Sequence, residues 1–233
     1  MLNSGPKLLV ALDYSTADQC LALVKQLNPS LCRLKIGKEL FTAAGPGVVE
    51  SVQKLGFDVF LDLKFHDIPN TVAGAVKSAA NLGVWMLNVH ACGGARMMEA
   101  AVAALQAYQH KPLLIAVTVL TSMDESDLLG VGIKEAPETV VQRLARLAKD
   151  SGMDGVVSSA KEVNAMKSAL GPAFLSITPG IRPATAAVGD QKRVVTPEQA
   201  IANGSDYIVV GRPITQAENP AQACAAIAAS IAD

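Results

Sequence analysis

The 233-residue sequence is poor in aromatic residues and in charge. Phe, Trp and Tyr make up 4% of the chain, which argues against the stacking platforms that hold single-stranded nucleic acid. The 20 Lys and Arg residues nearly balance the 21 Asp and Glu residues, so the chain lacks a broad positive field and must hold any anion locally. Charged residues make up 18% of the chain, against roughly 25% in a typical domain. This composition favours a large buried core over disorder.

Long apolar runs and paired cysteines are also missing. No window reaches the roughly 20 apolar residues that a membrane helix needs, and the run between Lys7 and Asp13 is too short for a signal peptide. The four cysteines have no CxxC spacing, so neither a zinc knuckle nor a redox pair is indicated. We therefore expect a cytoplasmic protein with reduced cysteines that binds neither membranes nor nucleic acid.

Eight short aliphatic and β-branched runs alternate with segments of helical periodicity, which is typical of parallel β/α units. The first and last runs start at residues 7 and 207, or roughly 29 residues per unit, close to the spacing in an eightfold barrel. The sequence therefore predicts an α/β fold, a (β/α)8 TIM barrel, as a single domain over 1–233. The predicted strands span 7–13, 31–37, 57–65, 86–91, 113–120, 155–160, 174–180 and 207–212. Helices are expected from residue 16, at 196–198 and from Pro220.

Charged residues gather where the first three predicted strands end. Asp13 ends the first strand and Lys35 lies near the end of the second. Asp62 and Lys64 lie in the last part of the third strand, and Asp67 follows it. The carboxyl ends of the strands form the working rim of such a barrel, where these charges are costly to pack unless they pair. Because side chains alternate along a strand, Asp62 and Lys64 are expected to point to the same side. An ammonium held between carboxylates stays protonated, so Lys64 is a candidate proton donor.

The last two predicted strands end in residues suited to a phosphate group. Gly211 and Arg212 close the eighth strand, and the loop after the seventh contains Pro179 and Arg182. TIM barrels hold phosphate at this rim with backbone N–H groups, and an arginine fork matches a phosphate. Further along the same loop, Gln191 lies among the glycine and polar residues typical of a lid that closes over a substrate.

The remaining polar candidates are hydroxyls and histidines. Thr121 and Ser122 follow the fifth strand, where hydroxyls either cap the chain or bind a polar ring. His90 is expected to form hydrogen bonds at the end of the fourth strand. With Asp62 and Asp67 nearby, His66 or His90 suggests a metal ligand, but Lys64 supplies a cation where a metal would bind. We therefore expect no metal.

Several short motifs surround these residues. They are DLKFHDIPNT at 62–71, VALD at 10–13, LKIG at 34–37, LTS at 120–122, TPGIR at 178–182 and VGR at 210–212. Together they make the chain resemble the bacterial type of orotidine 5'-phosphate decarboxylase over essentially its whole length. The resemblance implies decarboxylation of orotidine 5'-phosphate to UMP, the last step of de novo pyrimidine synthesis, without a metal or an organic cofactor.

The resemblance also implies a role for each matching residue. Lys64 protonates C6 of the pyrimidine as carbon dioxide leaves, while Asp62 lies against the substrate carboxylate. Lys35 and Asp67 complete the catalytic set. The enzyme is expected to be a homodimer in which Asp67 and Thr71 reach the partner's site. The other implied substrate contacts are Asp13 with Lys35 at the ribose hydroxyls, Thr121 and Ser122 at the pyrimidine, and Pro179, Arg182, Gln191, Gly211 and Arg212 toward the phosphate.

Two alternatives fit parts of this pattern. Sugar-phosphate decarboxylases and epimerases on the same barrel also use D-x-K-x-x-D, but they act on an acyclic enediolate with a magnesium ion. A non-catalytic sensor of nucleotide phosphates would keep the anion-binding residues, but it would not need Lys64 between two acids. Activity that survives a chelator would argue against the magnesium-dependent enzymes. Turnover of the nucleotide would argue against the non-catalytic sensor.

Overall fold

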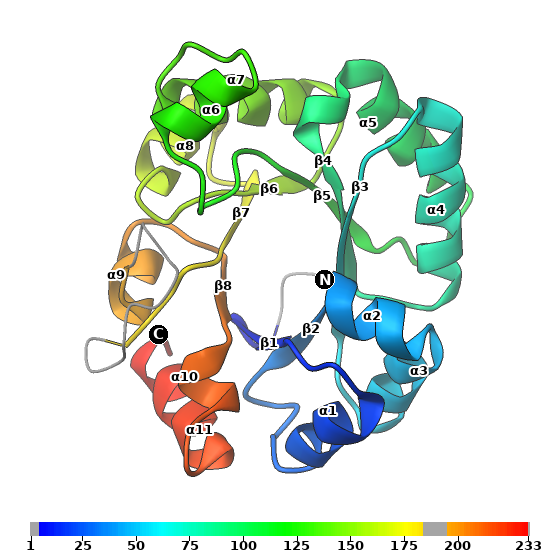
Figure 1. The fold of residues 1–233 in the computed structure, drawn as a ribbon, viewed down its shortest axis with the longest axis vertical. Helices are drawn as coiled ribbons and strands as arrows, with labels where there is room; N and C mark the ends of the chain where they lie inside the picture. Colours follow the sequence, from blue (N-terminus) through cyan, green and yellow to red (C-terminus); the bar gives the residue numbers. More distant parts are fainter. Residues whose placement is uncertain (1–4, 184–194, 233) are drawn as a thin grey trace.

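The structure, a computed structural model, describes residues 5–183 and 195–232. Within these ranges, eight parallel strands form a closed barrel in which each strand lies beside its neighbours in the sequence (Figure 1). The ring closes where β8 pairs with β1, with Val210 opposite Val10. The strands are β1 (Leu8–Leu12), β2 (Arg33–Gly37), β3 (Val59–Phe65), β4 (Met86–His90), β5 (Leu113–Val117), β6 (Gly155–Val157), β7 (Leu175–Thr178) and β8 (Tyr207–Val210). The predicted TIM barrel is confirmed.

Helices surround the barrel and cover the outer face of the sheet (Figure 1). They are α1 (Ala17–Val24), α2 (Lys38–Ala44), α3 (Gly47–Lys54), α4 (Pro69–Asn81), the 3-10 turn η1 (Ala91–Gly93), α5 (Ala95–Ala104), α6 (Glu125–Gly130), α7 (Pro137–Asp150), α8 (Val163–Leu170), α9 (Pro197–Ala202), α10 (Arg212–Thr215) and α11 (Pro220–Ser230). Thr16, Thr196 and Asn219 each cap a helix by accepting a backbone N–H. The starts expected at 196–198 and at Pro220 are confirmed, whereas the first helix begins at Ala17, one residue later than expected. None of the described helices combines the length and apolar character needed to cross a membrane.

Several strands are shorter than predicted at their carboxyl ends. Strands β5 and β6 end at Val117 and Val157, three residues before the predicted bounds. The hydroxyl of Thr118 then donates to the carbonyl of Val157 at 2.8 Å, and the chain leaves the sheet. Strand β7 ends at Thr178 because Pro179 has no N–H for a further ladder bond. After the early ends of β5 and β7, Val119, Leu120 and Pro179 line the mouth of the barrel.

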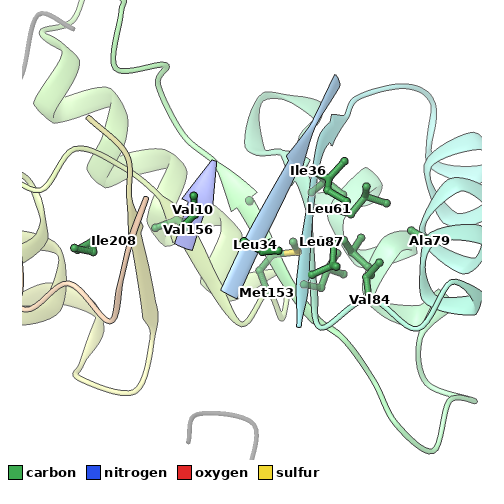
Figure 2. Packing of buried hydrophobic residues seen from close by; sticks show 14 of the residues in the cluster. Val10, Leu34, Ile36, Leu61, Ala79, Val84, Leu87, Met153, Val156 and Ile208 are labelled. Atoms are coloured by element: carbon green, nitrogen blue, oxygen red, sulfur yellow. The ribbon is translucent and has the colours of Figure 1, made fainter. Parts of the chain in front are cut away.

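Side chains on each strand alternate between two apolar cores. Leu8, Val10 and Leu12 of β1 point outward and pack with the helices, whereas Leu9 and Ala11 point into the barrel. Figure 2 shows part of the outer core, with Leu61, Leu87 and other strand residues packed toward the helical layer. The inner core consists of Leu9, Ala11, Phe60, Trp85, Met86, Leu113, Ile115, Leu175, Ile177, Tyr207 and Val209. Burial on both faces explains why the strands are almost continuously hydrophobic.

A buried cation closes the amino end of the barrel. Arg33, the first residue of β2, is 4% exposed, and its guanidinium lies 4.1 Å from the centre of the Trp85 ring. Its Nε donates to Asp58 at 3.0 Å and its Nη1 donates to the carbonyl of Pro6 at 2.6 Å. Tyr207 packs edge-on against Trp85 with ring centres 5.1 Å apart. With this end filled, the barrel interior is reached from the carboxyl ends of the strands.

Candidate active site

A cavity of about 270 Å³ opens at the carboxyl ends of the strands, the end opposite Arg33. Six of the predicted site residues line it: Lys35, Asp62, Lys64, Thr121, Ser122 and Pro179. The rest of the lining is apolar and consists of Phe60, Val117, Val119, Leu120, Val157, Ile177 and Val209. A few polar groups on an apolar wall are typical of a site that orients a small ligand.

Asp62 lies between two lysines at the floor of this cavity. Nζ of Lys64 is 2.6 Å from Oδ1 of Asp62, and Nζ of Lys35 is 3.2 Å from Oδ2. The side chain of Asp62 is 11% exposed, and burial alone would raise the pKa of its carboxyl. The ammonium groups of Lys35 and Lys64 outweigh burial, so the pKa of Asp62 is lowered. The cavity therefore holds an ionised carboxylate with a cation on each oxygen.

The backbone at Lys64 departs from the strand conformation. Its φ is 52°, and among the described residues it is the sole non-glycine residue with a positive φ. A left-handed conformation costs about 1–2 kcal/mol for such a residue. The pairing of β3 with β4 is irregular here, because the register passes from Leu61 opposite Leu87 directly to Phe65 opposite Val89. Strained backbone beside reactive groups is a common property of functional sites.

Asn88 of β4 joins this group, and sequence analysis missed it. Its Nδ2 donates to Oδ1 of Asp62 and its Oδ1 accepts the backbone N–H of Lys64, both at 2.7 Å. One signal was available in the sequence: Asn88 is a polar residue inside the otherwise apolar run Met86–Val89, on the same side as Met86. An amide at such a position must be hydrogen-bonded within the barrel.

Asp13 connects the charged group to the end of β8. Its Oδ1 is 3.6 Å from Nζ of Lys35, although its side chain is 66% exposed. A Cβ added to Gly211 would lie 3.7 Å from Oδ2 of Asp13, and one added to Gly37 would lie 3.3 Å from Nζ of Lys35. These glycines leave room for the charged side chains. Arg212 follows Gly211 as the first residue of α10 and is exposed.

Asp67, Thr71 and Arg182 are not among the residues that line the cavity. Asp67 and Thr71 are exposed on the outer surface, where Asp67 accepts the N–H of Ile68 at 2.6 Å and borders a second hollow with His66 and Cys92. Arg182 is buried, and its guanidinium donates to the carbonyl of Ile181 at 3.0 Å.

The predicted phosphate ligand Gln191 lies outside the described residues, as does the rest of the expected lid at 189–191. The other residues predicted to bind a phosphate through a side chain or backbone N–H, Gly211, Arg212 and Arg182, lie within the described residues. Of these residues, Gly211 lies beside Asp13, whose carboxylate contacts Lys35.

His90 does not form the expected hydrogen bond at its buried nitrogen. Its ring stacks on His66 with centres 5.4 Å apart, and among the described residues its Nδ1 has no hydrogen-bond partner. Burial and the nearby charges of His66, Lys38 and Lys64 lower the pKa of His90 to about 4, so the ring is neutral at physiological pH. Within residues 5–183 and 195–232, no group of three or more His, Cys, Asp or Glu side chains is arranged to hold a metal ion.

The chain is similar to known proteins over its whole length. Residues 6–227 match the model of the orotidine 5'-phosphate decarboxylase / HUMPS family. The chain is 74% identical to orotidine 5'-phosphate decarboxylase of Teredinibacter turnerae (99% of this chain, 100% of the relative) and 63% identical to that of Saccharophagus degradans (97% and 95%). The crystal structure of orotidine 5'-phosphate decarboxylase from Lactobacillus acidophilus superposes with a TM-score of 0.87 at 39% identity, over 99% of this chain and 100% of that one. The chain therefore belongs to the orotidine 5'-phosphate decarboxylase / HUMPS family.

Proposed function

We propose that the protein decarboxylates orotidine 5'-phosphate to UMP and that Lys64 gives the proton to C6 of the pyrimidine. Both bacterial relatives are named for this decarboxylase activity, and they match 97% or more of the chain. The observation that best supports the role of Lys64 is its ammonium, 2.6 Å from an ionised and largely buried Asp62 at the floor of the cavity.

The chemistry of the reaction requires such a group. When the bond from C6 to the carboxylate breaks, carbon dioxide leaves and the electron pair stays on C6 as a vinylic carbanion, which no adjacent carbonyl delocalises well. The protein must therefore stabilise the charge electrostatically and supply a proton. The proton moves from Nζ of Lys64 to C6, and the neutral amine regains a proton from solvent. Asp62 lies beside the substrate carboxylate in this proposal, and repulsion between the two negative charges favours loss of the carboxylate as carbon dioxide.

The rest of the substrate is held by the surrounding residues in this proposal. Asp13 and Lys35 bind the ribose hydroxyls, Thr121 and Ser122 bind the pyrimidine, and Gly211, Arg212, Arg182 and Gln191 bind the phosphate, with Pro179 on the same side. Four of these residues line the cavity, and Asp13 lies beside both Lys35 and Gly211. Binding energy from the phosphate, far from C6, helps to organise the pocket for the chemical step.

We also propose a homodimer in which Asp67 and Thr71 contribute to the partner's site. Both residues are exposed, and Ile68 between them is 67% exposed, as expected for an apolar residue that a second copy covers. Lys64→Ala and Asp67→Ala are each expected to be nearly inactive, whereas refolding them together should restore about one quarter of the activity, because a mixed dimer has one intact site. No recovery in mixed dimers would contradict the shared site.

We place this activity in the bacterial cytoplasm. Cys20, Cys32 and Cys224 are buried and free, as is common for proteins in a reducing compartment.

An ultraviolet assay with orotidine 5'-phosphate in the presence of EDTA tests the proposed reaction. Loss of the orotate absorbance with formation of UMP is the expected result. Dependence on magnesium with an acyclic sugar phosphate as substrate would favour the sugar-phosphate enzymes instead. Tight binding of orotidine 5'-phosphate without turnover would favour the sensor.

A further inference from the structure

Asn88 is a buried polar residue of β4 that the proposed roles leave unused. Its side chain is completely buried. It lies two residues after Met86, which belongs to the inner core, and therefore points into the barrel. On the β5 side of the sheet, Asn88 is paired with Ile115, whose side chain has no polar group. Its polar partners consequently come from β3.

Both polar atoms of Asn88 bind the residues at the centre of the proposed chemistry. Oδ1 accepts the backbone N–H of Lys64, and Nδ2 donates to Oδ1 of Asp62. The reverse orientation would place the amide oxygen against a carboxylate and the NH₂ group against an N–H. The orientation of the amide is therefore fixed by the chemistry of its two partners.

The contact with Lys64 lies where β3 separates from the regular ladder. Asn88 is the β4 residue between the pairs formed by Leu61 and Phe65, so it faces the irregular segment that contains Lys64. Its side chain gives the N–H of Lys64 an acceptor while the backbone adopts its positive φ. The amide thus stabilises the conformation that directs the Lys64 side chain into the cavity.

The contact with Asp62 completes the hydrogen bonds of the carboxylate. Oδ1 accepts from both Lys64 and Asn88, while Oδ2 faces Lys35. Three donors around two oxygens fix the plane of the carboxylate. A rotation of this plane would move Nζ of Lys64, which is bound to it.

We propose that Asn88 is a positioning residue that fixes Lys64 and Asp62 relative to each other before the substrate binds. This inference rests on the proposed role of Lys64 as proton donor. Asn88 acts through these two residues, so its loss should lower kcat more than it changes KM. No other side chain of similar size provides the same pair of contacts: a carboxylate cannot donate to Asp62, and a leucine can neither donate nor accept.

The first test compares Asn88→Leu with Leu87→Ala. Leu87, the preceding residue, packs on the opposite face of β4 in the outer core (Figure 2) and serves as a control for loss of stability. We expect Asn88→Leu to lower kcat by about 100-fold. KM and the binding of UMP should stay within about threefold of wild type, while Leu87→Ala lowers Tm without a comparable loss of kcat. A kcat for Asn88→Leu within about threefold of wild type would overturn the proposal.

The second test uses the pH dependence of Asn88→Asp, which is independent of how well Asn88→Leu folds. The new carboxyl would face Asp62 and Lys64 of β3 and Lys35 of β2. At about pH 8 the two carboxylates repel each other, whereas at about pH 5 the pair takes up one proton. That proton restores a donor toward Asp62, while the carbonyl oxygen still accepts from Lys64.

The activity of Asn88→Asp relative to wild type should therefore rise at least about tenfold from pH 8 to pH 5, whereas the relative activity of Asn88→Leu stays flat. A flat ratio for both variants would overturn the positioning role. The proposed function is judged separately, because an inactive wild-type protein would contradict it whatever the variants do.

Discussion

Nζ of Lys64 lies 2.6 Å from Oδ1 of Asp62, and both side chains enter one cavity although the backbone at Lys64 leaves the strand conformation. The proposed proton donor and its counter-ion are therefore in contact in the structure, which holds no substrate. Electrostatic groups that are fixed in advance need no reorganisation during the reaction, which is the main source of their catalytic effect.

Lys64→Ala should lower kcat by at least about 1,000-fold while the protein stays folded, because it removes both the proton donor and the nearest positive charge. Single-turnover decarboxylation measures the loss, and circular dichroism checks the fold. Lys54→Ala, at the end of α3, is the matched control and should behave like wild type. Substantial decarboxylation by Lys64→Ala would refute the assigned role.

Arg212→Ala should raise KM for orotidine 5'-phosphate by about 10- to 100-fold, because a charge-assisted bond to the phosphate is lost. The same variant should use orotidine, which has no phosphate, as well as wild type does. Steady-state kinetics with the two substrates make the comparison. An unchanged KM for the phosphorylated substrate would exclude Arg212 from the phosphate site.

Asp62 should make stability depend on pH in acid. Its pKa is lowered in the folded protein, so it contributes stability above the unfolded value of about 3.9 that is lost as the pH falls through the folded value. Asp62→Asn should cost about 3 kcal/mol at pH 7, since the buried ammonium of Lys35 and the partly exposed ammonium of Lys64 both lose this carboxylate.

Urea unfolding at several pH values measures this difference. The difference in the free energy of unfolding between wild type and Asp62→Asn should become smaller as the pH falls below about 4. The control Asp150→Asn, at the exposed end of α7, should have almost the same free energy of unfolding as wild type at every pH. A difference between wild type and Asp62→Asn that stays constant into strong acid would contradict the lowered pKa of Asp62.

Arg33→Lys should destabilise the protein by about 1–2 kcal/mol, because lysine keeps the charge but loses the planar stacking on Trp85. Thermal unfolding should show the lower Tm. The kcat should not change, since Arg33 closes the end of the barrel opposite the cavity. A loss of activity without a loss of stability would show that the two ends are coupled.

The fold could be predicted from the sequence because each strand is buried on both faces and reads as a short hydrophobic run. The position of Lys64 was predicted for a reason that is only partly right. Regular alternation was expected to place it beside Asp62, but the structure reaches the same result through a positive φ and an irregular ladder. The two-residue alternation of side chains along a regular strand cannot reveal such a local departure from strand geometry.

Other parts of the site were not accessible to pattern analysis. Asn88 acts through contacts between neighbouring strands, which depend on the register of β3 against β4 rather than on spacing along one strand. Asp67 and Thr71 lie on the outer surface, so their proposed role depends on a second copy of the chain. The carboxyl ends of β5 and β6 depend on where side-chain hydroxyls such as that of Thr118 replace ladder bonds.

The seam between β1 and β8 affects how the protein is made. Val10 meets Val210, so the ring cannot close until nearly the whole chain has left the ribosome. Until then, β1 and the most recently synthesised strand both expose unpaired N–H and C=O groups to other nascent chains. The open edge of β1 therefore persists through synthesis of the seven strands that follow it and is covered only when β8 arrives.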